Sequence, residues 1–219
     1  RRQIREVSIV TVTFPVDFLS DFPGWSTEFD LLYRQEQSRS ANGKTYAKDL
    51  GSPLWKATYQ SRSLRPNELD YWRARLKALE NGLQTFKAWP LSRTYPIAYP
   101  RGSWPTGGAF SGSGLVNALT SKTLSLSDLP SGYVVSIGDY VQVGTADLYQ
   151  ALETATANGS GVTGIFEVRT FVWPTSLVGQ AAKLVKPACV MTLVPDSLTT
   201  TANLSDGRGT ITFQAIEAR

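Results

Sequence analysis

The fold class is first indicated by residues 54–64, which have the sequence LWKATYQSRSL. Apolar and polar side chains alternate here, so that Trp55 and Tyr59 fall on one side of an extended chain and Lys56 falls on the other. A period of two predicts a β-strand with one buried and one solvated face. Trp55 and Tyr59 are therefore candidate core residues.

A helix is predicted directly after this strand, at about residues 66–81. Pro66 suits the first helical turn, and Gly82 lies where a left-handed residue ends many helices. The apolar positions of the segment step by three or four residues, so they form one stripe on a helix. We expect the stripe to pack against the strand. The predicted core residues are Trp55, Tyr59, Leu69, Trp72 and Leu76.

The rest of the chain predicts short strands separated by turns. Residues 35–51 are polar, contain Asn42-Gly43 and indicate an exposed hairpin or a long loop. The predicted strands are 7–14, 28–34, 83–89, 122–126, 133–137, 140–143, 148–152, 164–170, 188–194 and 210–216.

We therefore expect a mainly β (α+β) fold, an antiparallel β-sandwich or split barrel with one packed amphipathic helix and a second β-rich half. The expected regions are 1–101, a β-sheet plus the helix, and 102–219, a β-rich sandwich or barrel. The second region either forms a separate domain or completes the first.

The composition argues against several functional classes. The 219 residues include no His and a single Cys, Cys189. Without His, the usual general base near neutral pH and the commonest transition-metal ligand are missing. A lone Cys makes neither an internal disulfide nor a cysteine-based metal site. We expect no metal, no cofactor and an inert, buried thiol at Cys189.

Neither a leader peptide nor a membrane-spanning segment is indicated by the sequence. The basic residues at the N-terminus are not followed by a long apolar run, and Lys183, Lys186 and Pro187 interrupt the apolar stretch 177–193. We expect a soluble protein with no membrane partner, made where thiols stay reduced.

The positive charge is concentrated in one part of the chain. The net charge is +4, and thirteen of the 22 Lys and Arg residues lie in residues 34–101, against five Asp and Glu. A nucleic-acid binder would place such charge on one face, with aromatic residues between. The alternative is an ordinary solvated face. We expect no specific nucleic acid partner.

Catalytic motifs are not supported by the spacing of the candidate residues. The glycine-rich stretches match neither a nucleophile elbow nor a phosphate or dinucleotide loop. A glycosidase would need two facing carboxylates, for which Asp139 with Glu153 or Glu167 are the candidates. However, Asp139 follows Gly138 and suits a turn. We expect no enzymatic activity.

Aromatic residues in turns are the best candidates for contact with a partner. Trp25 and Trp104 lie beside prolines, where a Trp either contacts another molecule, such as a carbohydrate, or packs locally under a loop. The loops 35–51 and 106–114 are expected to contact neighbouring molecules. The candidate partner-contact residues are Trp25, Asn42, Lys44, Trp104 and Phe110.

Two stretches resemble the distal tail proteins (baseplate hub ring proteins) of siphophage-like tailed bacteriophages. Residues 54–86 are similar to the family's strand, helix and return strand, which reads LENGLQTF at 79–86. Residues 129–191 are similar in carrying LPSG at 129–132, IGDYV at 137–141 and Lys186-Pro187 before a late strand. The resemblance covers roughly residues 54–216, and its motifs are structural.

The resemblance implies a structural virion protein without catalytic residues. It would form a ring of identical subunits, expected to be a hexamer, that connects the tail tube to the baseplate or tail tip. Its partners would be its own copies, the tail tube protein and the hub or tip proteins, with DNA passing through the ring. The ring would assemble in the bacterial cytoplasm. The alternative functions are a carbohydrate- or receptor-binding β-sandwich module of a tail tip and, third, a glycosidase.

Overall fold

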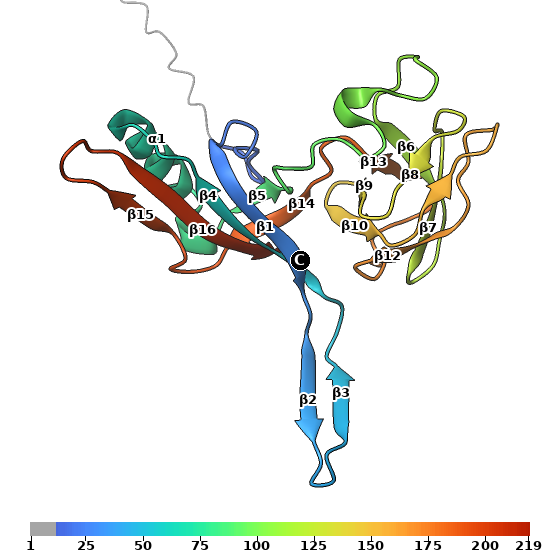
Figure 1. The fold of residues 1–219 in the computed structure, drawn as a ribbon, viewed down its shortest axis with the longest axis horizontal. Coiled ribbons are helices and arrows are strands. Elements are labelled where there is room, and N and C mark those ends of the chain that lie inside the picture. Colours follow the sequence, from blue (N-terminus) through green and yellow to red (C-terminus); the bar gives the residue numbers. More distant parts are fainter. Residues whose placement is uncertain (1–11) are drawn as a thin grey trace, which may run out of the picture.

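The computed structural model describes residues 12–219 of the chain, which form two bodies and a projecting arm (Figure 1). Residues 12–219 are mainly β with one α-helix, and their paired strands run antiparallel, which confirms the predicted fold class. Most of the predicted strand 7–14 lies outside the described residues. We call the two bodies the sheet body and the barrel body.

The sheet body contains a six-stranded sheet whose central strand is the last of the chain. This strand, β16, pairs with β4 on one side and with β14 and β15 on the other. The order along the main path is β1 (Gly24–Leu32), β4 (Leu54–Ser61), β16 (Gly209–Glu217), β14 (Cys189–Leu193) and β5 (Thr85–Ala88), with β15 (Thr199–Ala202) attached to β16.

The register between strands explains the alternation seen in the sequence. Phe213 lies opposite Tyr59, and Ala215 lies opposite Ala57. These four residues are all buried, whereas Lys56 on the other face is exposed. Side chains directly opposite each other in an antiparallel pair share one face. One face of the sheet is therefore apolar and covered, and the other is polar.

Helix α1 (Pro66–Lys77) covers the apolar face of this sheet (Figure 1). It ends before the predicted residue 81, because the chain turns there into a short 3-10 helix, η1 (Glu80–Gly82). Asn81 and Gly82 have positive φ angles of 52° and 105°. At Gly82 a Cβ would lie 2.6 Å from the carbonyl oxygen of Leu193, so the close approach to β14 favours glycine.

The core of the sheet body is an aromatic cluster around Phe213. The ring of Phe213 lies 5.2 Å from that of Tyr59, 5.5 Å from that of Phe22 and 6.2 Å from that of Phe86, centroid to centroid. The predicted core residues Trp55, Tyr59, Leu69, Trp72 and Leu76 are all buried in this cluster.

The barrel body is a closed barrel of six strands. Gly112 precedes the first strand with a φ of 76°, and an added Cβ would lie 2.3 Å from Val185, so glycine is required where the chain enters the barrel. Around the barrel the order is β10 (Asp147–Ala151), β12 (Phe166–Arg169), β7 (Thr123–Ser127), β6 (Ser113–Leu119), β13 (Ala181–Lys183) and β9 (Tyr140–Val143). Strands β8 (Val134–Val135) and β11 (Ala155–Thr156) form a separate ribbon, and η2 (Pro100–Gly102) precedes the barrel.

The structure divides the chain differently from the predicted regions 1–101 and 102–219. The barrel strands span residues 113–183, and residues 189–217 return to the sheet body. The barrel is thus an insertion between β5 and β14. The first barrel strand, β6, begins at Ser113, and the C-terminal strands β14, β15 and β16 complete the sheet body. The reason is non-local: β16 supplies the centre of a sheet whose other strands begin at residue 24.

The burial of Leu76 gives a direct test of the helix–sheet contact. Leu76 is fully buried in the aromatic cluster, whereas Leu83, shortly after the helix, is 79% exposed. Leu76→Ala is expected to lower the free energy of unfolding by about 2–5 kcal/mol, because it leaves a cavity in the core. Leu83→Ala is the matched control and is expected to change it by less than about 0.5 kcal/mol. Urea denaturation measures both, and equal effects would contradict the assigned packing.

Candidate functional site

The most exposed element of the chain is a two-stranded arm, β2 (Gln35–Arg39) and β3 (Thr45–Asp49). Every residue of both strands is exposed, and the arm projects away from the two bodies (Figure 1). Asn42 and Lys44 lie at its tip, in a turn where the Ser40 hydroxyl donates to Asn42 and Lys44 Nζ lies 5.4 Å from the Tyr46 ring centroid. The predicted exposed hairpin at 35–51 is confirmed.

The two faces of the arm differ in charge. Glu36 lies opposite Lys48, and Ser38 lies opposite Tyr46, so the even-numbered side chains of both strands share one face. We call this the basic arm face, and it comprises Arg34, Glu36, Lys44, Tyr46, Lys48 and Leu50. The opposite face carries one Arg and one Asp among polar or small residues. The basic arm face therefore has a net positive charge and two exposed apolar groups.

Strand β1 forms an edge of the sheet. Within residues 12–219 it pairs only with β4, so its other edge has no strand partner there. Trp25 lies in a register shift near its start and is 80% exposed. Glu28 and Asp30 are exposed on its polar face, and neither lies within 4.0 Å of a basic group in the described part of the chain.

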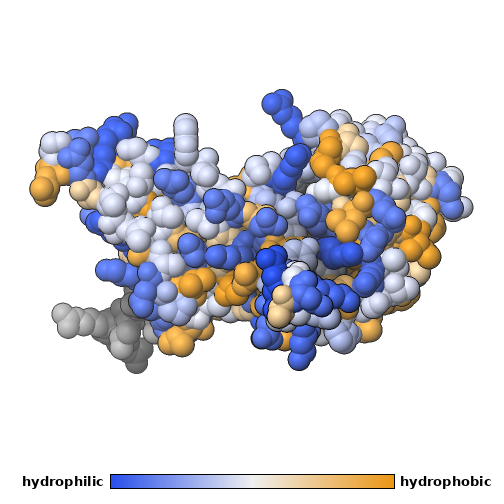
Figure 2. Space-filling model, turned by 60° about the horizontal axis from the view of Figure 1, so that its bottom comes forward, coloured by the Kyte–Doolittle hydropathy of each residue, from blue (hydrophilic) through white to orange (hydrophobic). Residues whose placement is uncertain are grey.

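A shallow groove of about 190 Å³ runs along this polar face beside β1. Glu28 and Asp30 line it together with Leu31, Leu32, Lys56, Thr58 and Gln214. On the face drawn in Figure 2, where the bottom of Figure 1 comes forward, apolar residues occur as separate groups among hydrophilic ones. Because they are exposed or lack a strand partner in residues 12–219, the arm, the edge of β1 and Trp25 are the candidate contact surfaces.

Trp104 and Phe110, two of the predicted partner-contact residues, pack within their own chain. They are partly buried against the core of the barrel body, with their ring centroids 4.9 Å apart. Phe110 lies 5.8 Å from Tyr133, and Tyr99 is also buried there, 4.7 Å from Tyr133. The loop 106–114 thus folds its aromatic residue inward, because packing removes apolar area from water. For Trp104, the structure shows local packing, which was one of the two alternatives expected from the sequence.

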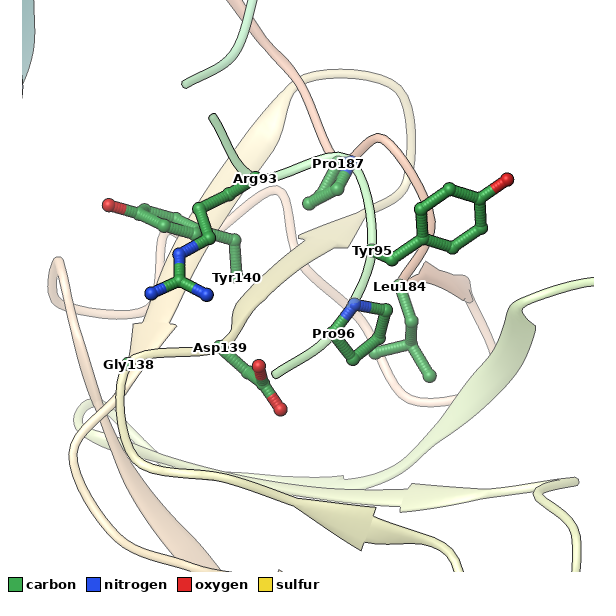
Figure 3. Close-up of a pocket in the computed structure, with 8 residues that line it drawn as sticks. All are labelled: Arg93, Tyr95, Pro96, Gly138, Asp139, Tyr140, Leu184 and Pro187. Carbon is green, nitrogen blue, oxygen red and sulfur yellow. The ribbon is translucent and has the colours of Figure 1, made fainter. Parts of the chain in front are cut away.

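The three candidate carboxylates have structural roles. Both oxygens of Asp139 accept backbone hydrogen bonds, from Ile97 and from Ser136, at 2.8 Å each. Asp139 lies beside a cavity of about 10 Å³ (Figure 3), which has room for one water molecule at most. Glu153 accepts a hydrogen bond from the backbone of Glu167, whose own carboxylate pairs with Arg169 at 2.6 Å. Each of the three carboxylates is thus engaged in a local contact.

The thiol of Cys189 is enclosed by the core of the sheet body. Cys189 is buried, and burial raises the pKa of its thiol well above the ordinary value, so the thiolate is disfavoured. In residues 12–219, no three side chains of the metal-ligating types are grouped to hold an ion. None of the helices in the same residues has the length and apolar character needed to cross a membrane.

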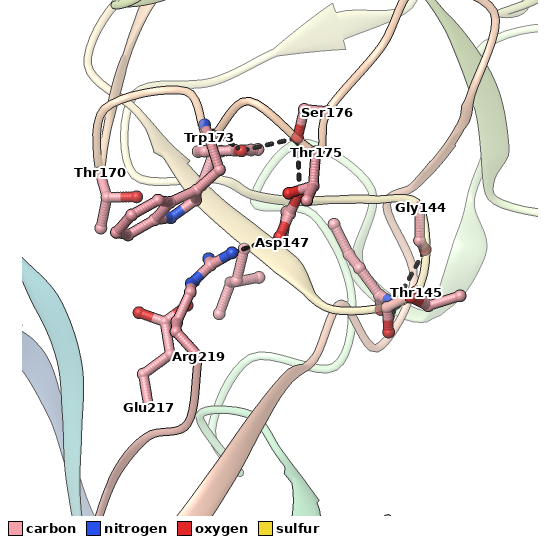
Figure 4. Close-up of polar contacts among 12 residues, drawn as sticks. Gly144, Thr145, Asp147, Thr170, Trp173, Thr175, Ser176, Glu217 and Arg219 are labelled. Carbon is pink, nitrogen blue, oxygen red and sulfur yellow. Dashed lines mark hydrogen bonds and ion pairs between the residues drawn. The ribbon is translucent and has the colours of Figure 1, made fainter. Parts of the chain in front are cut away.

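A partly buried polar network joins the two bodies (Figure 4). Arg219 pairs with Asp147 of the barrel body and with Glu217 of β16, and its guanidinium lies 4.0 Å from the Trp173 ring centroid. The indole N–H of Trp55 donates to the carbonyl oxygen of Leu148 at 2.8 Å. The network therefore fixes the barrel against the sheet body through groups that are far apart in the sequence.

An open groove of about 520 Å³ adjoins this network, between Trp173, Gln180 and Arg219. Its polar groups are already engaged. Asp147 accepts from Thr175 and Ser176, and Gln180 bonds to the backbone of Leu177 and Thr175. The groove thus belongs to the interface between the two bodies, where its polar groups bond to each other. Sequence reasoning missed the network, because Asp147 and Arg219 carry no local signal of their pairing.

Comparison with known proteins adds no family to these observations. No model of a protein family matches the chain, and no curated protein matches it.

The buried carboxyl of Asp139 predicts a dependence of stability on pH. Burial raises the pKa of Asp139 above its ordinary value, although the two backbone hydrogen bonds and the charge of Arg93 act in the opposite direction. The folded state therefore holds this proton more tightly than the unfolded state, so the contribution of Asp139 to stability falls as pH rises through the raised pKa.

Asp139→Asn removes this titration. The difference in unfolding free energy between the native chain and Asp139→Asn is expected to favour the native chain more at acidic pH, where the carboxyl is protonated, than at pH 7. Urea denaturation at a series of pH values measures this difference. A difference that is constant or grows with pH would contradict the burial assigned to Asp139.

Proposed function

We propose that the protein is a structural subunit of a bacteriophage tail that forms a ring connecting the tail tube to the baseplate or tail tip. The observation that carries the proposal is the arm, in which every residue of β2 and β3 is exposed. A two-stranded hairpin alone is at best marginally stable in water. An arm with this geometry is best explained as an element that packs against another molecule.

The sheet body supports the same proposal, because it offers a contact that differs from the arm. One copy carries both an arm and the unpaired edge of β1, at different places on its surface (Figure 1). When two different surfaces of the same chain bind each other, the contact repeats head to tail and closes into a ring if the rotation allows. We infer a homo-oligomer of this kind and expect six subunits.

The proposal includes the partners and the place of assembly. The ring faces would contact the tail tube protein and the hub or tip proteins, and the ring would be built in the bacterial cytoplasm and end in the virion. DNA would pass through the lumen without specific contacts.

Removing the arm tests the proposal. Arg34 and Leu50 lie opposite each other at its base, since the Leu50 amide donates to the Arg34 carbonyl at 2.8 Å. A variant in which Asn-Gly replaces residues 35–49 keeps this pair and closes the ribbon with a tight turn. It is expected to unfold within about 1 kcal/mol of the native chain, because no arm side chain lies in a core.

The native chain is expected to form rings, and the armless variant is expected to remain monomeric. Light scattering after size-exclusion chromatography gives the mass, and negative-stain electron microscopy shows the shape. A native chain that stays monomeric up to its solubility limit, or an armless variant that forms the same rings, would contradict the proposal.

The second candidate function is a carbohydrate- or receptor-binding module. The observation that favours it is Trp25, which remains 80% exposed, and an exposed Trp is a common centre of binding energy. The other Trp candidate, Trp104, packs against the core of the barrel body together with Tyr99, whereas Tyr95 nearby is 40% exposed.

Trp25→Ala separates the two functions. As a contact between subunits, Trp25 is expected to contribute roughly 1–3 kcal/mol, so its loss should weaken ring formation about tenfold or more. Light scattering over a concentration series measures this effect. Tyr71→Ala, which removes another exposed aromatic ring from the surface of α1, is the matched control. Unchanged assembly together with lost binding to a glycan array would favour the second function.

A further inference from the structure

The outer edge of β1 has the properties of a site that accepts another strand. It is nine residues long, and its sequence GWSTEFDLL contains neither Pro nor Lys. Proteins normally protect such edges with proline, lysine, a covering loop or a very short strand. The shift at Trp25 disturbs β1 near one end, and near the other end the Leu31 amide donates to the carboxylate of Asp30 at 2.7 Å. The other backbone groups on the outer edge of β1 have no strand partner in residues 12–219 and can accept a further strand.

Strand β3 has the matching properties of a donor. It pairs with β2 along one edge only, so its other edge has no strand partner in residues 12–219. The arm continues directly from β1 through Leu32 and Arg34 and points away from the sheet (Figure 1). An arm that leaves the sheet in this direction cannot fold back along its own β1. Within residues 12–219, the chain's own arm is therefore not the occupant of the β1 edge.

The charges on the two edges are complementary. Glu28 and Asp30 lie on the polar face of β1, and Lys44, Tyr46 and Lys48 lie along β3 on the basic arm face. In an antiparallel register that places Lys48 opposite Glu28, the two diagonal neighbours of Asp30 are Lys44 and Lys48. Opposite charges at such positions stabilise a pair of strands, and like charges destabilise it. Strand β2 suits this edge less well, because it carries Glu36 on the same face.

We propose that strand β3 of one copy of this chain adds to the free edge of β1 in the next copy, with Lys44 and Lys48 beside Glu28 and Asp30. The inference rests on the proposed function, because it names the contact that joins one ring subunit to the next. The contact is head to tail, since the donor and the acceptor are different surfaces of the same chain. It would also complete the hydrogen bonding of an arm that packs against neither body of its own chain.

Two charge-reversed variants test the pairing. The arm variant carries Lys44→Glu and Lys48→Glu, and the edge variant carries Glu28→Lys and Asp30→Lys. All four side chains are exposed, so both variants are expected to fold. Alone, each is expected to need a roughly tenfold or greater protein concentration for ring formation, because attraction at the contact becomes repulsion. The matched control for the arm variant is Lys77→Glu with Lys122→Glu, which changes the net charge by the same amount and in the same direction but lies on α1 and beside β7.

Mixing the two variants provides the decisive result. In a mixture, each reversed arm meets a reversed edge, and each native arm meets a native edge. Rings with alternating subunits are therefore expected to form at native concentrations, as are rings of a single chain that carries all four substitutions. Light scattering gives the mass, and a mass difference introduced by a tag on one variant shows whether the subunits alternate.

Several outcomes would overturn the pairing while leaving the ring proposal intact. In the first outcome, the native chain forms rings and each charge-reversed variant forms rings at the same protein concentration. In the second, neither variant forms rings alone and their mixture forms none either. A chain that lacks residues 1–11 is expected to form rings as the native chain does. If this shortened chain forms no rings while the charge-reversed variants form them normally, the β1 edge would be assigned to residues 1–11 instead of to β3. If the native chain forms no ring at all, the proposed function itself fails.

Discussion

The whole molecule depends on the packing of Phe213 at the centre of the sheet. Its ring contacts aromatic residues from β4, from β5 and from the segment before β1, including Tyr59, Phe86 and Phe22. Aromatic side chains dominate core energetics, since each removes a large area from water. Phe213 belongs to β16, which is also the strand that links β4 to β14 and β15. The sheet body therefore forms only when the last strand of the chain has joined the first ones.

This constraint explains the position of the barrel body. Because β5 and β14 must lie side by side in the sheet, the residues between them leave the sheet and return close to the point of exit. The barrel strands occupy this insertion and have their own apolar core. The hydrogen bond from Trp55 to Leu148 and the pairing of Arg219 with Asp147 then hold the two bodies together. The burial of Glu217 raises its pKa, although Arg219 beside it acts against this effect.

Local patterns in the sequence predicted the elements better than their arrangement. The alternation at Trp55 and Tyr59 and the helical stripe through Leu76 are short-range signals, and both identify buried faces. The central place of β16 could not be predicted this way, because strand order depends on contacts between distant residues. The same holds for Trp104 and Phe110, whose inward packing on Tyr133 depends on the closed barrel. For the arm, the polar composition of 35–51 predicted exposure, but the different charges of its faces follow only from the register.

The central claim is that the arm exists to contact another copy of the chain. Backbone amides that lack a tertiary environment exchange with solvent through local opening, and packing against a partner slows this exchange. Hydrogen exchange detected by mass spectrometry, on the dilute monomer and on the assembled fraction, measures it directly. We expect the backbone amides of peptides that cover β1, β2 and β3 to exchange more slowly in the assembly than in the monomer. We expect the exchange of peptides from the barrel core to stay the same. Equal exchange of the arm in the monomer and in the assembly would contradict it.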